Sequence, residues 1–168
     1  MFNRRESFSE YIRLYPVISI LIALNIGIYL LTWLPGIGEE LYFLGVGSNG
    51  LIAAGEWWRF FTPMFLHLNF SHILFNMFSL FVFAPELEKL LGKMRFITLY
   101  LIAGLFANIA TYFIHDYDYA HVGASGAIFG LFGAYGALVY YTKNTLPQLR
   151  QVMLPLIIIS VVMTFIQS

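Results

Sequence analysis

Ser125 lies in a short run of small residues, from Gly123 to Gly126, where a polar link gives way to an apolar segment. Gly123 and Gly126 allow backbone torsions and close approaches that other residues resist. If Ser125 begins a helix, free backbone N–H groups and the helix dipole favour negative charge beside it. A serine hydroxyl that attacks a carbonyl builds such a charge, so Ser125 is a candidate nucleophile for acyl transfer. A serine N-cap ahead of a glycine-rich membrane helix is the simpler alternative.

A second polar group lies at the start of another apolar segment. His67 precedes this segment, and His72 and Asn76 stand four residues apart near its beginning, so they share one helical face. Their N–H groups could donate to an oxyanion formed at Ser125. This chemistry requires the hydroxyl and the two donors to lie at the same depth on neighbouring helices. In the alternative, the polar side chains only satisfy one another and nearby backbone carbonyls.

The composition indicates that the elements carrying these residues lie in a membrane. Of the 168 residues, 60% are hydrophobic and 11% are charged, whereas a soluble domain has about 45–50% and about 25%. Aromatic residues make up 18% of the chain, and many stand near the ends of apolar runs, as in interfacial belts. The chain has no cysteine, which excludes disulfides and thiolate metal sites. Scattered basic residues and zero net charge give no support for nucleic-acid binding.

Five apolar segments approach the roughly 20 residues that cross a bilayer as a helix. The connection between the first two segments, residues 35–59, is rich in glycine and holds two adjacent tryptophans, which predicts an interfacial element with short helices of its own. Residues 1–15 are expected to form a cytoplasmic amphipathic lead, and residues 16–168 a membrane domain. We expect the spans at Pro16–Leu34, His72–Ala84, Ile97–Ile114, Ser125–Tyr141 and from Val152 to Ser168.

Orientation follows from the basic residues in the links between spans. Eight of the nine lysines and arginines fall in the lead and in the links after the second and fourth spans, and only Arg59 falls elsewhere. This asymmetry predicts a cytoplasmic N-terminus. It places the tryptophan-rich connection and the link at residues 115–124 on the outer side, so that His72, Asn76 and Ser125 all lie at outer helix ends.

The predicted fourth span carries small residues at close intervals, including Gly126 and Gly130. Small residues let membrane helices approach closely. We therefore expect this helix to pack centrally and to tolerate no bulky residue at Gly126 or Gly130.

Taken together, these elements make the chain resemble the rhomboid family of intramembrane serine proteases. The resemblance runs from residue 57 to about residue 133, in the family's order and spacing. It is carried by Trp58-Arg59, by His67 with His72 and Asn76, by Leu87-Glu88-Lys89 with Leu91-Gly92, and by Gly123-Ala-Ser-Gly126 with Ile128-Phe-Gly130.

The resemblance implies an all-α, polytopic, rhomboid-like helical bundle in a membrane, expected to be the bacterial plasma membrane, with five of six core helices present. It implies cleavage of single-pass membrane protein substrates near the outer face, with Ser125 as nucleophile and with His72, Asn76 and the Ser125 N–H as the oxyanion hole. Arg59 and Glu88 would be structural, and no metal or cofactor would be needed.

One departure concerns the general base. The family's base is a histidine on the sixth helix, and the sequence ends before any such helix. His121, four residues before Ser125, is the alternative base among the four histidines. We therefore expect a C-terminally incomplete rhomboid whose 168 residues alone are inactive, because a serine without its base keeps only a small part of its catalytic power.

Two other functions remain open from the sequence. A non-catalytic rhomboid-like protein could bind membrane helices without cutting them, although such proteins commonly lack the serine or the oxyanion groups, which this chain retains. A small channel or transporter usually shows ionisable groups at mid-membrane or broken helices at a pore, whereas the interior polar groups here gather near one face.

Overall fold

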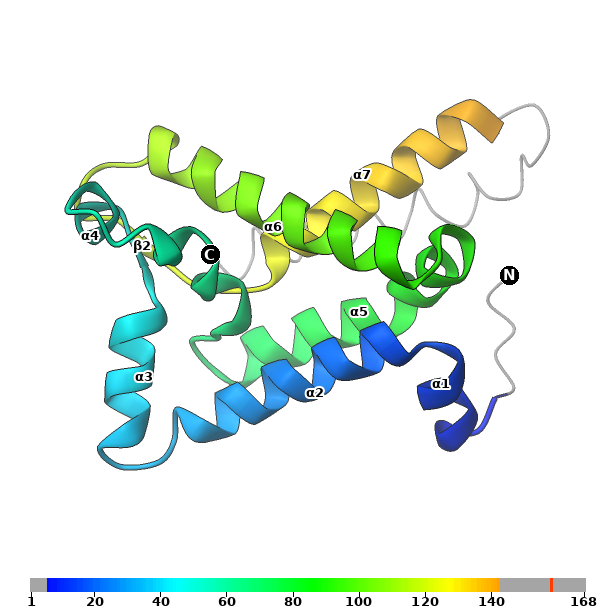
Figure 1. The fold of residues 1–168 in the computed structure, drawn as a ribbon, viewed down its shortest axis with the longest axis horizontal. Coiled ribbons are helices and arrows are strands. Elements are labelled where there is room, and N and C mark those ends of the chain that lie inside the picture. The colour runs from blue at the N-terminus through cyan, green and yellow to red at the C-terminus, as the bar shows by residue number, and fades with distance from the viewer. Residues whose placement is uncertain (1–5, 143–157, 159–168) are drawn as a thin grey trace.

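The computed structural model describes residues 6–142 and residue 158. The fold is a bundle of helices with a small irregular layer at one end (Figure 1). This arrangement confirms the expected all-α class. In chain order the elements are α1 (Phe8–Leu14), α2 (Pro16–Leu31), α3 (Ile37–Gly45), β1 (Gly47–Ser48), α4 (Asn49–Ala53), the 3-10 turns η1 (Trp57–Phe60) and η2 (Thr62–Phe65), α5 (Phe70–Leu91), α6 (Lys93–Ile114), β2 (Ala120–His121) and α7 (Ser125–Thr142).

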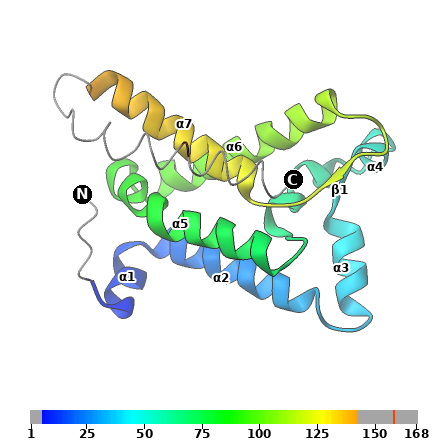
Figure 2. The same cartoon turned by 180° about the vertical axis from the view of Figure 1, so that it is seen from behind.

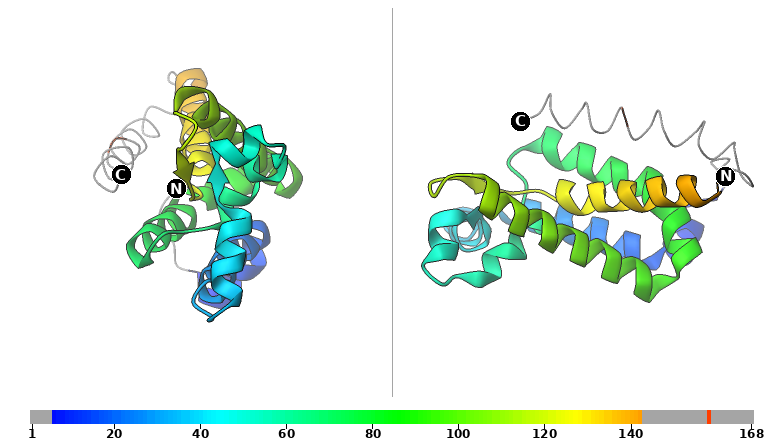
Figure 3. Two further views of the ribbon diagram at one scale, coloured as in Figure 1. Left: turned by 90° about the vertical axis from the view of Figure 1, so that its left-hand side faces the viewer. Right: turned by 90° about the horizontal axis from the view of Figure 1, so that it is seen from above.

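The bundle is built from two packed pairs of helices. Helix α2 lies along α5, and α6 lies along α7 (Figure 2). Helix α7 also contacts α5, so that it lies between α5 and α6 in the view from above (Figure 3). The core between them is aromatic and aliphatic, and its fully buried members include Tyr100 and Tyr135. The expected central placement of the glycine-rich helix agrees with this packing.

Two of the described helices, α5 and α6, are each long and apolar enough to cross a membrane. Helices α1 and α2 count as one further span only when taken together, and they meet at a bend of 109°. Helix α7 begins at Ser125, where the fourth span was expected, and is not one of these two candidates. The span expected from Val152 onward lies outside the described residues.

Helix α5 is longer than expected and runs through Pro85 instead of ending at Ala84. Proline lacks an N–H and therefore leaves the carbonyl four residues earlier without its helical donor. That carbonyl belongs to Phe81, and the Tyr11 hydroxyl of α1 donates to it at 3.2 Å. The Tyr135 hydroxyl of α7 donates to the neighbouring Phe83 carbonyl at 2.5 Å. The Tyr11 hydroxyl thus replaces the donor that the proline removes, and the Tyr135 bond anchors the same turn of α5 to α7.

Interactions between distant segments also fix the helix ends. The Glu88 carboxylate accepts the Val17 N–H at 3.2 Å and the Ile18 N–H at 3.1 Å. These donors lie in the first turn of α2, where no helical carbonyl is available to them. At the opposite end, β1 and β2 pair antiparallel, with Gly47 opposite His121, and this pair connects the first long connection to the link before α7.

Candidate functional site

Ser125 is the first residue of α7, and the loop before it is held to the first long connection. The Gly123 N–H donates to the Pro63 carbonyl at 2.8 Å. Gly123 has φ +129°, a backbone conformation that side-chain-bearing residues rarely adopt. The first N–H groups of a helix have no partner within it, so the Ser125 N–H stands where an oxyanion could use it.

His72 lies in the first turn of α5, and Asn69 sets where that turn begins. The Asn69 side chain accepts the His72 N–H at 2.9 Å and so forms the N-cap of α5. This places the imidazole against Gly123: a Cβ at Gly123 would stand 2.6 Å from His72 Nε2 and 3.7 Å from Ser125 Oγ. The imidazole and the hydroxyl therefore flank the same point, from the starts of two helices far apart in sequence.

Asn76 lies one turn further along α5 and is buried. Its Nδ2 donates to the His72 carbonyl at 2.8 Å. An amide nitrogen carries two hydrogens, so this bond leaves the second N–H to point elsewhere. The bond also fixes the amide on the face of α5 that carries His72, as the four-residue spacing predicted.

His67 lies just before α5 and supports the His72 ring. The two ring centroids are 5.1 Å apart, with the planes at 70°. His67 is only 2% exposed, and neither of its nitrogens has a hydrogen-bond partner among the described residues. Burial, together with the neighbouring His72, lowers the pKa of His67 to about 3, so the ring is neutral near pH 7.

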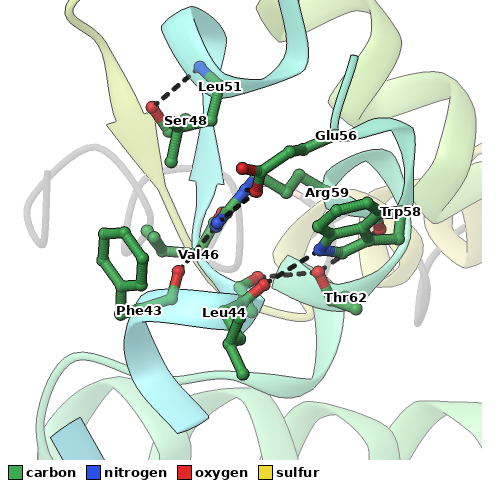
Figure 4. A network of polar contacts seen from close by, with 10 residues as sticks. Phe43, Leu44, Val46, Ser48, Leu51, Glu56, Trp58, Arg59 and Thr62 are labelled. Carbon is green, nitrogen blue, oxygen red and sulfur yellow. Dashed lines mark hydrogen bonds and ion pairs between the residues drawn. The ribbon is translucent and has the colours of Figure 1, made fainter. Parts of the chain in front are cut away.

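Arg59 lies apart from the serine and organises the first long connection (Figure 4). Its guanidinium is fully buried. It pairs with Glu56 at 2.6 Å and donates to the carbonyls of Phe43 at 2.6 Å and Val46 at 2.8 Å. One cation thus joins the end of α3 to η1, and the connection is a folded element with short helices of its own, as its composition predicted.

Gly126 lies at the contact between α7 and α6. A Cβ at Gly126 would stand 2.5 Å from the Ala107 Cβ, and one at Gly130 would stand 2.1 Å from the Ala103 Cβ. These distances are well below an ordinary carbon–carbon contact of about 3.5–4 Å. Both glycines therefore set how closely the serine-bearing helix approaches α6.

His121 lies in β2, with its ring against the first connection. A Cβ at Gly47 would meet His121 Nε2 at 2.7 Å and Pro63 Cγ at 2.7 Å. His115 stacks on Tyr119 with ring centroids 3.9 Å apart, and Tyr119 stacks on His121 at 6.0 Å. Burial and the nearby His115 lower the pKa of His121. The described contacts of His121 are thus with the first long connection and with Tyr119.

Sequence reasoning did not single out Asn69, Pro63 or Glu56, although each holds a candidate site residue or the connection around it. Asn69 could have been found, because an asparagine directly before an apolar helical run is a common N-cap. The carbonyl of Pro63 and the partner of Arg59 depend on contacts that no local pattern predicts.

Comparison with known proteins decides the family. The family model of the rhomboid domain matches residues 54–168, which is more than half of the chain. The chain belongs to the rhomboid family. This rhomboid is 46% identical over 170 residues to the putative rhomboid protease YdcA of Bacillus subtilis, an alignment that covers all of this chain and 85% of that protein.

Shorter alignments relate this rhomboid to other named proteases. It is 44% identical over 96 residues to the rhomboid protease GluP of Bacillus subtilis, covering 57% of this chain and 18% of that protein. It is 30% identical over 142 residues to the rhomboid protease AarA of Providencia stuartii, covering 73% of this chain and 50% of that protein. The family and the apolar helices make this rhomboid a membrane protein from a family of intramembrane proteases.

Proposed function

We propose that this rhomboid belongs to the catalytic members of its family and is a serine endopeptidase that cleaves single-pass membrane proteins within the bilayer. The observation that carries the proposal is the meeting at Gly123, where His72 Nε2 and Ser125 Oγ approach the same point from α5 and α7. A rhomboid-like protein that only binds helices would have no need for an imidazole and a serine hydroxyl at one place.

In the proposed reaction, Ser125 Oγ attacks the scissile carbonyl carbon and its proton passes to a base. The carbonyl oxygen becomes an oxyanion, which accepts hydrogen bonds from His72, from the second N–H of Asn76 and from the Ser125 N–H. Collapse of this intermediate breaks the peptide C–N bond and releases the amine with a proton, leaving an ester on Ser125. Water then hydrolyses the ester and restores the hydroxyl.

The residues around the proposed oxyanion hole have contacts that fit a supporting role. His67 is neutral near pH 7 and packs edge-on against His72, so it can hold that ring in place without adding charge. Arg59 and Glu88 act at a distance, the first by folding the outer connection and the second by capping α2. We propose that the site lies near the outer membrane face with the N-terminus cytoplasmic, expected in a bacterial plasma membrane.

No candidate for the general base contacts Ser125 in the part of the chain that the structure describes. His67 packs behind His72, while His115 and His121 stack with Tyr119 in the outer layer. None of these three has a described contact with Ser125. We infer that the 168 residues alone react slowly, because oxyanion groups without a base retain only about 10³–10⁴-fold catalysis over water in a triad hydrolase.

Labelling with a serine-directed fluorophosphonate tests both parts. The purified chain in detergent should label slowly, added imidazole should accelerate the labelling by supplying the base, and Ser125→Ala should abolish it. The control Ser71→Ala, on the exposed side of α5, should leave labelling unchanged. Fast labelling at Ser125 without imidazole would refute the inferred inactivity. If no condition labels Ser125, the serine protease is refuted and the helix-binding alternative is favoured.

A further inference from the structure

An apolar pocket of about 350 Å³ lies between α2 and the first long connection. Ile28 of α2 forms one side, Leu41 and Leu44 of α3 form another, and Trp58, Thr62 and Phe65 close it from η1 and η2. Its volume is within the range of about 300–1,000 Å³ that is typical of small-molecule sites. The pocket is separate from the serine, which lies at the start of α7.

The chemistry of the lining determines what could bind. Two lining side chains carry polar atoms that face carbonyls of the connection: Trp58 Nε1 donates to Leu44 at 3.2 Å, and Thr62 Oγ1 donates to Gly45 at 2.8 Å (Figure 4). Both donors are therefore already bonded, and the remaining surface is hydrocarbon and aromatic ring. A ligand with polar groups would lose its hydrogen bonds to water without replacement.

The surroundings of the pocket are also apolar and exposed. Phe43 and Leu44 of α3 and the Trp58 ring are exposed beside it, and Trp33 is exposed where α2 ends. In a membrane protein such side chains contact lipid, and tryptophan is enriched at the level of the headgroups. The pocket thus lies beside an exposed apolar surface, with the Trp58 ring shared between the two.

The geometry points to a binding site for one acyl chain of a membrane phospholipid, with its headgroup at the level of Trp58. The acyl chain would fill the space between α2 and the first connection. Its carbon atoms would then make the dispersion contacts that the lining side chains lack around an empty space. Leu66 lines the pocket and directly precedes His67. An occupied pocket would therefore brace the connection that leads into α5.

Quenching of Trp58 fluorescence tests the site without any assay of activity. The chain has three tryptophans, and Trp33 and Trp57 are exposed, so Trp33→Phe with Trp57→Phe leaves Trp58 as the single reporter. The protein in detergent is titrated with phosphatidylcholine brominated on its acyl chains. A site predicts quenching that saturates at a low mole fraction of lipid, whereas ordinary contact predicts quenching that grows in proportion to it.

Ile28→Phe and Ile20→Phe make a matched pair on one helix. Ile28 lines the pocket, whereas Ile20 is 65% exposed on α2 away from it. We expect Ile28→Phe to weaken the saturable binding at least about tenfold, corresponding to about 1.4 kcal/mol, and Ile20→Phe to leave it unchanged. If Ile28→Phe alters the helical circular dichroism, Leu41→Phe, which fills the pocket from α3, replaces it as the test variant. Proportional quenching in every variant, or a pocket that proves to hold a second copy of the chain by crosslinking, would overturn the proposal.

Discussion

Replacing Gly130 by alanine tests whether the contact between α6 and α7 determines the stability of the bundle. The added methyl would stand 2.1 Å from the Ala103 Cβ, so the two helices would have to separate locally by more than about 1 Å to reach an ordinary contact. Such overpacking costs about 1–3 kcal/mol. The higher helix propensity of alanine offsets up to about 1 kcal/mol of this loss of stability.

Gly133→Ala, one turn further along α7, serves as the control for Gly130→Ala, because it gains the same helix propensity. Gly133 is exposed, and apart from its neighbours and the backbone of its own helix no described atom lies within 4 Å of where its Cβ would be. Both substitutions gain the same propensity, so the difference between them isolates overpacking and should be about 1–3 kcal/mol. Gly130→Leu should destabilise the protein further, because a leucine cannot be accommodated by a small shift.

Unfolding in mixed micelles, with sodium dodecyl sulfate as denaturant and circular dichroism as readout, measures the difference. Ala103→Gly in the Gly130→Ala background should recover most of the lost free energy, because it removes the opposing methyl, and the double-mutant cycle should show coupling. Equal free energies of unfolding for Gly130→Ala and Gly133→Ala would refute the close packing of α6 on α7. Failure of Ala103→Gly to recover stability would refute the assignment of the clash.

Three further predictions use the same unfolding assay. Glu88→Gln should destabilise the protein by about 1.5–3 kcal/mol, since hydrogen bonds to charged groups contribute this much, while Glu86→Gln on the same helix serves as the control. Tyr135→Phe should cost about 1 kcal/mol, because it removes the hydrogen bond from the Tyr135 hydroxyl to the Phe83 carbonyl. Stability should be full above pH 6.5 and fall as the pH drops toward 3, because the unfolded chain takes up a proton at His67 that the folded chain, with the pKa of His67 lowered to about 3, does not. A flat unfolding midpoint between pH 7 and pH 4 would contradict the last prediction.

Hydropathy predicts a span well when each residue contributes to the apolar character of the segment independently of its partners elsewhere in the fold. Apolar runs located α2, α6 and α7, and the expected start of the fourth span at Ser125 is confirmed. The same pattern ended the second span near Ala84, whereas α5 continues to Leu91, because the charged residues near Glu88 were interpreted as a link outside the membrane. The Glu88 carboxylate instead faces the first turn of α2, and no local pattern contains that partner.

The candidate site divides in the same way. The residue types Ser125, His72 and Asn76 could be chosen from sequence because their chemistry and spacing are local properties. The approach of Ser125 to His72 depends on Gly123, whose backbone conformation and whose bond to the Pro63 carbonyl bring the serine loop to the imidazole. Such an arrangement depends on two connections folding against each other, which the sequence pattern of neither one specifies.

This dependence makes the first long connection part of the site, although its side chains do no proposed chemistry. Arg59 holds the end of α3 to η1, and the next turn, η2, presents the Pro63 carbonyl that fixes Gly123. A buried guanidinium that loses a partner leaves an uncompensated charge, which is far more harmful than the loss of an exposed ion pair. Disturbing Arg59 should therefore shift Pro63, then Gly123, and through it the alignment of Ser125 with His72, which makes the stability of the first long connection a condition for an aligned serine.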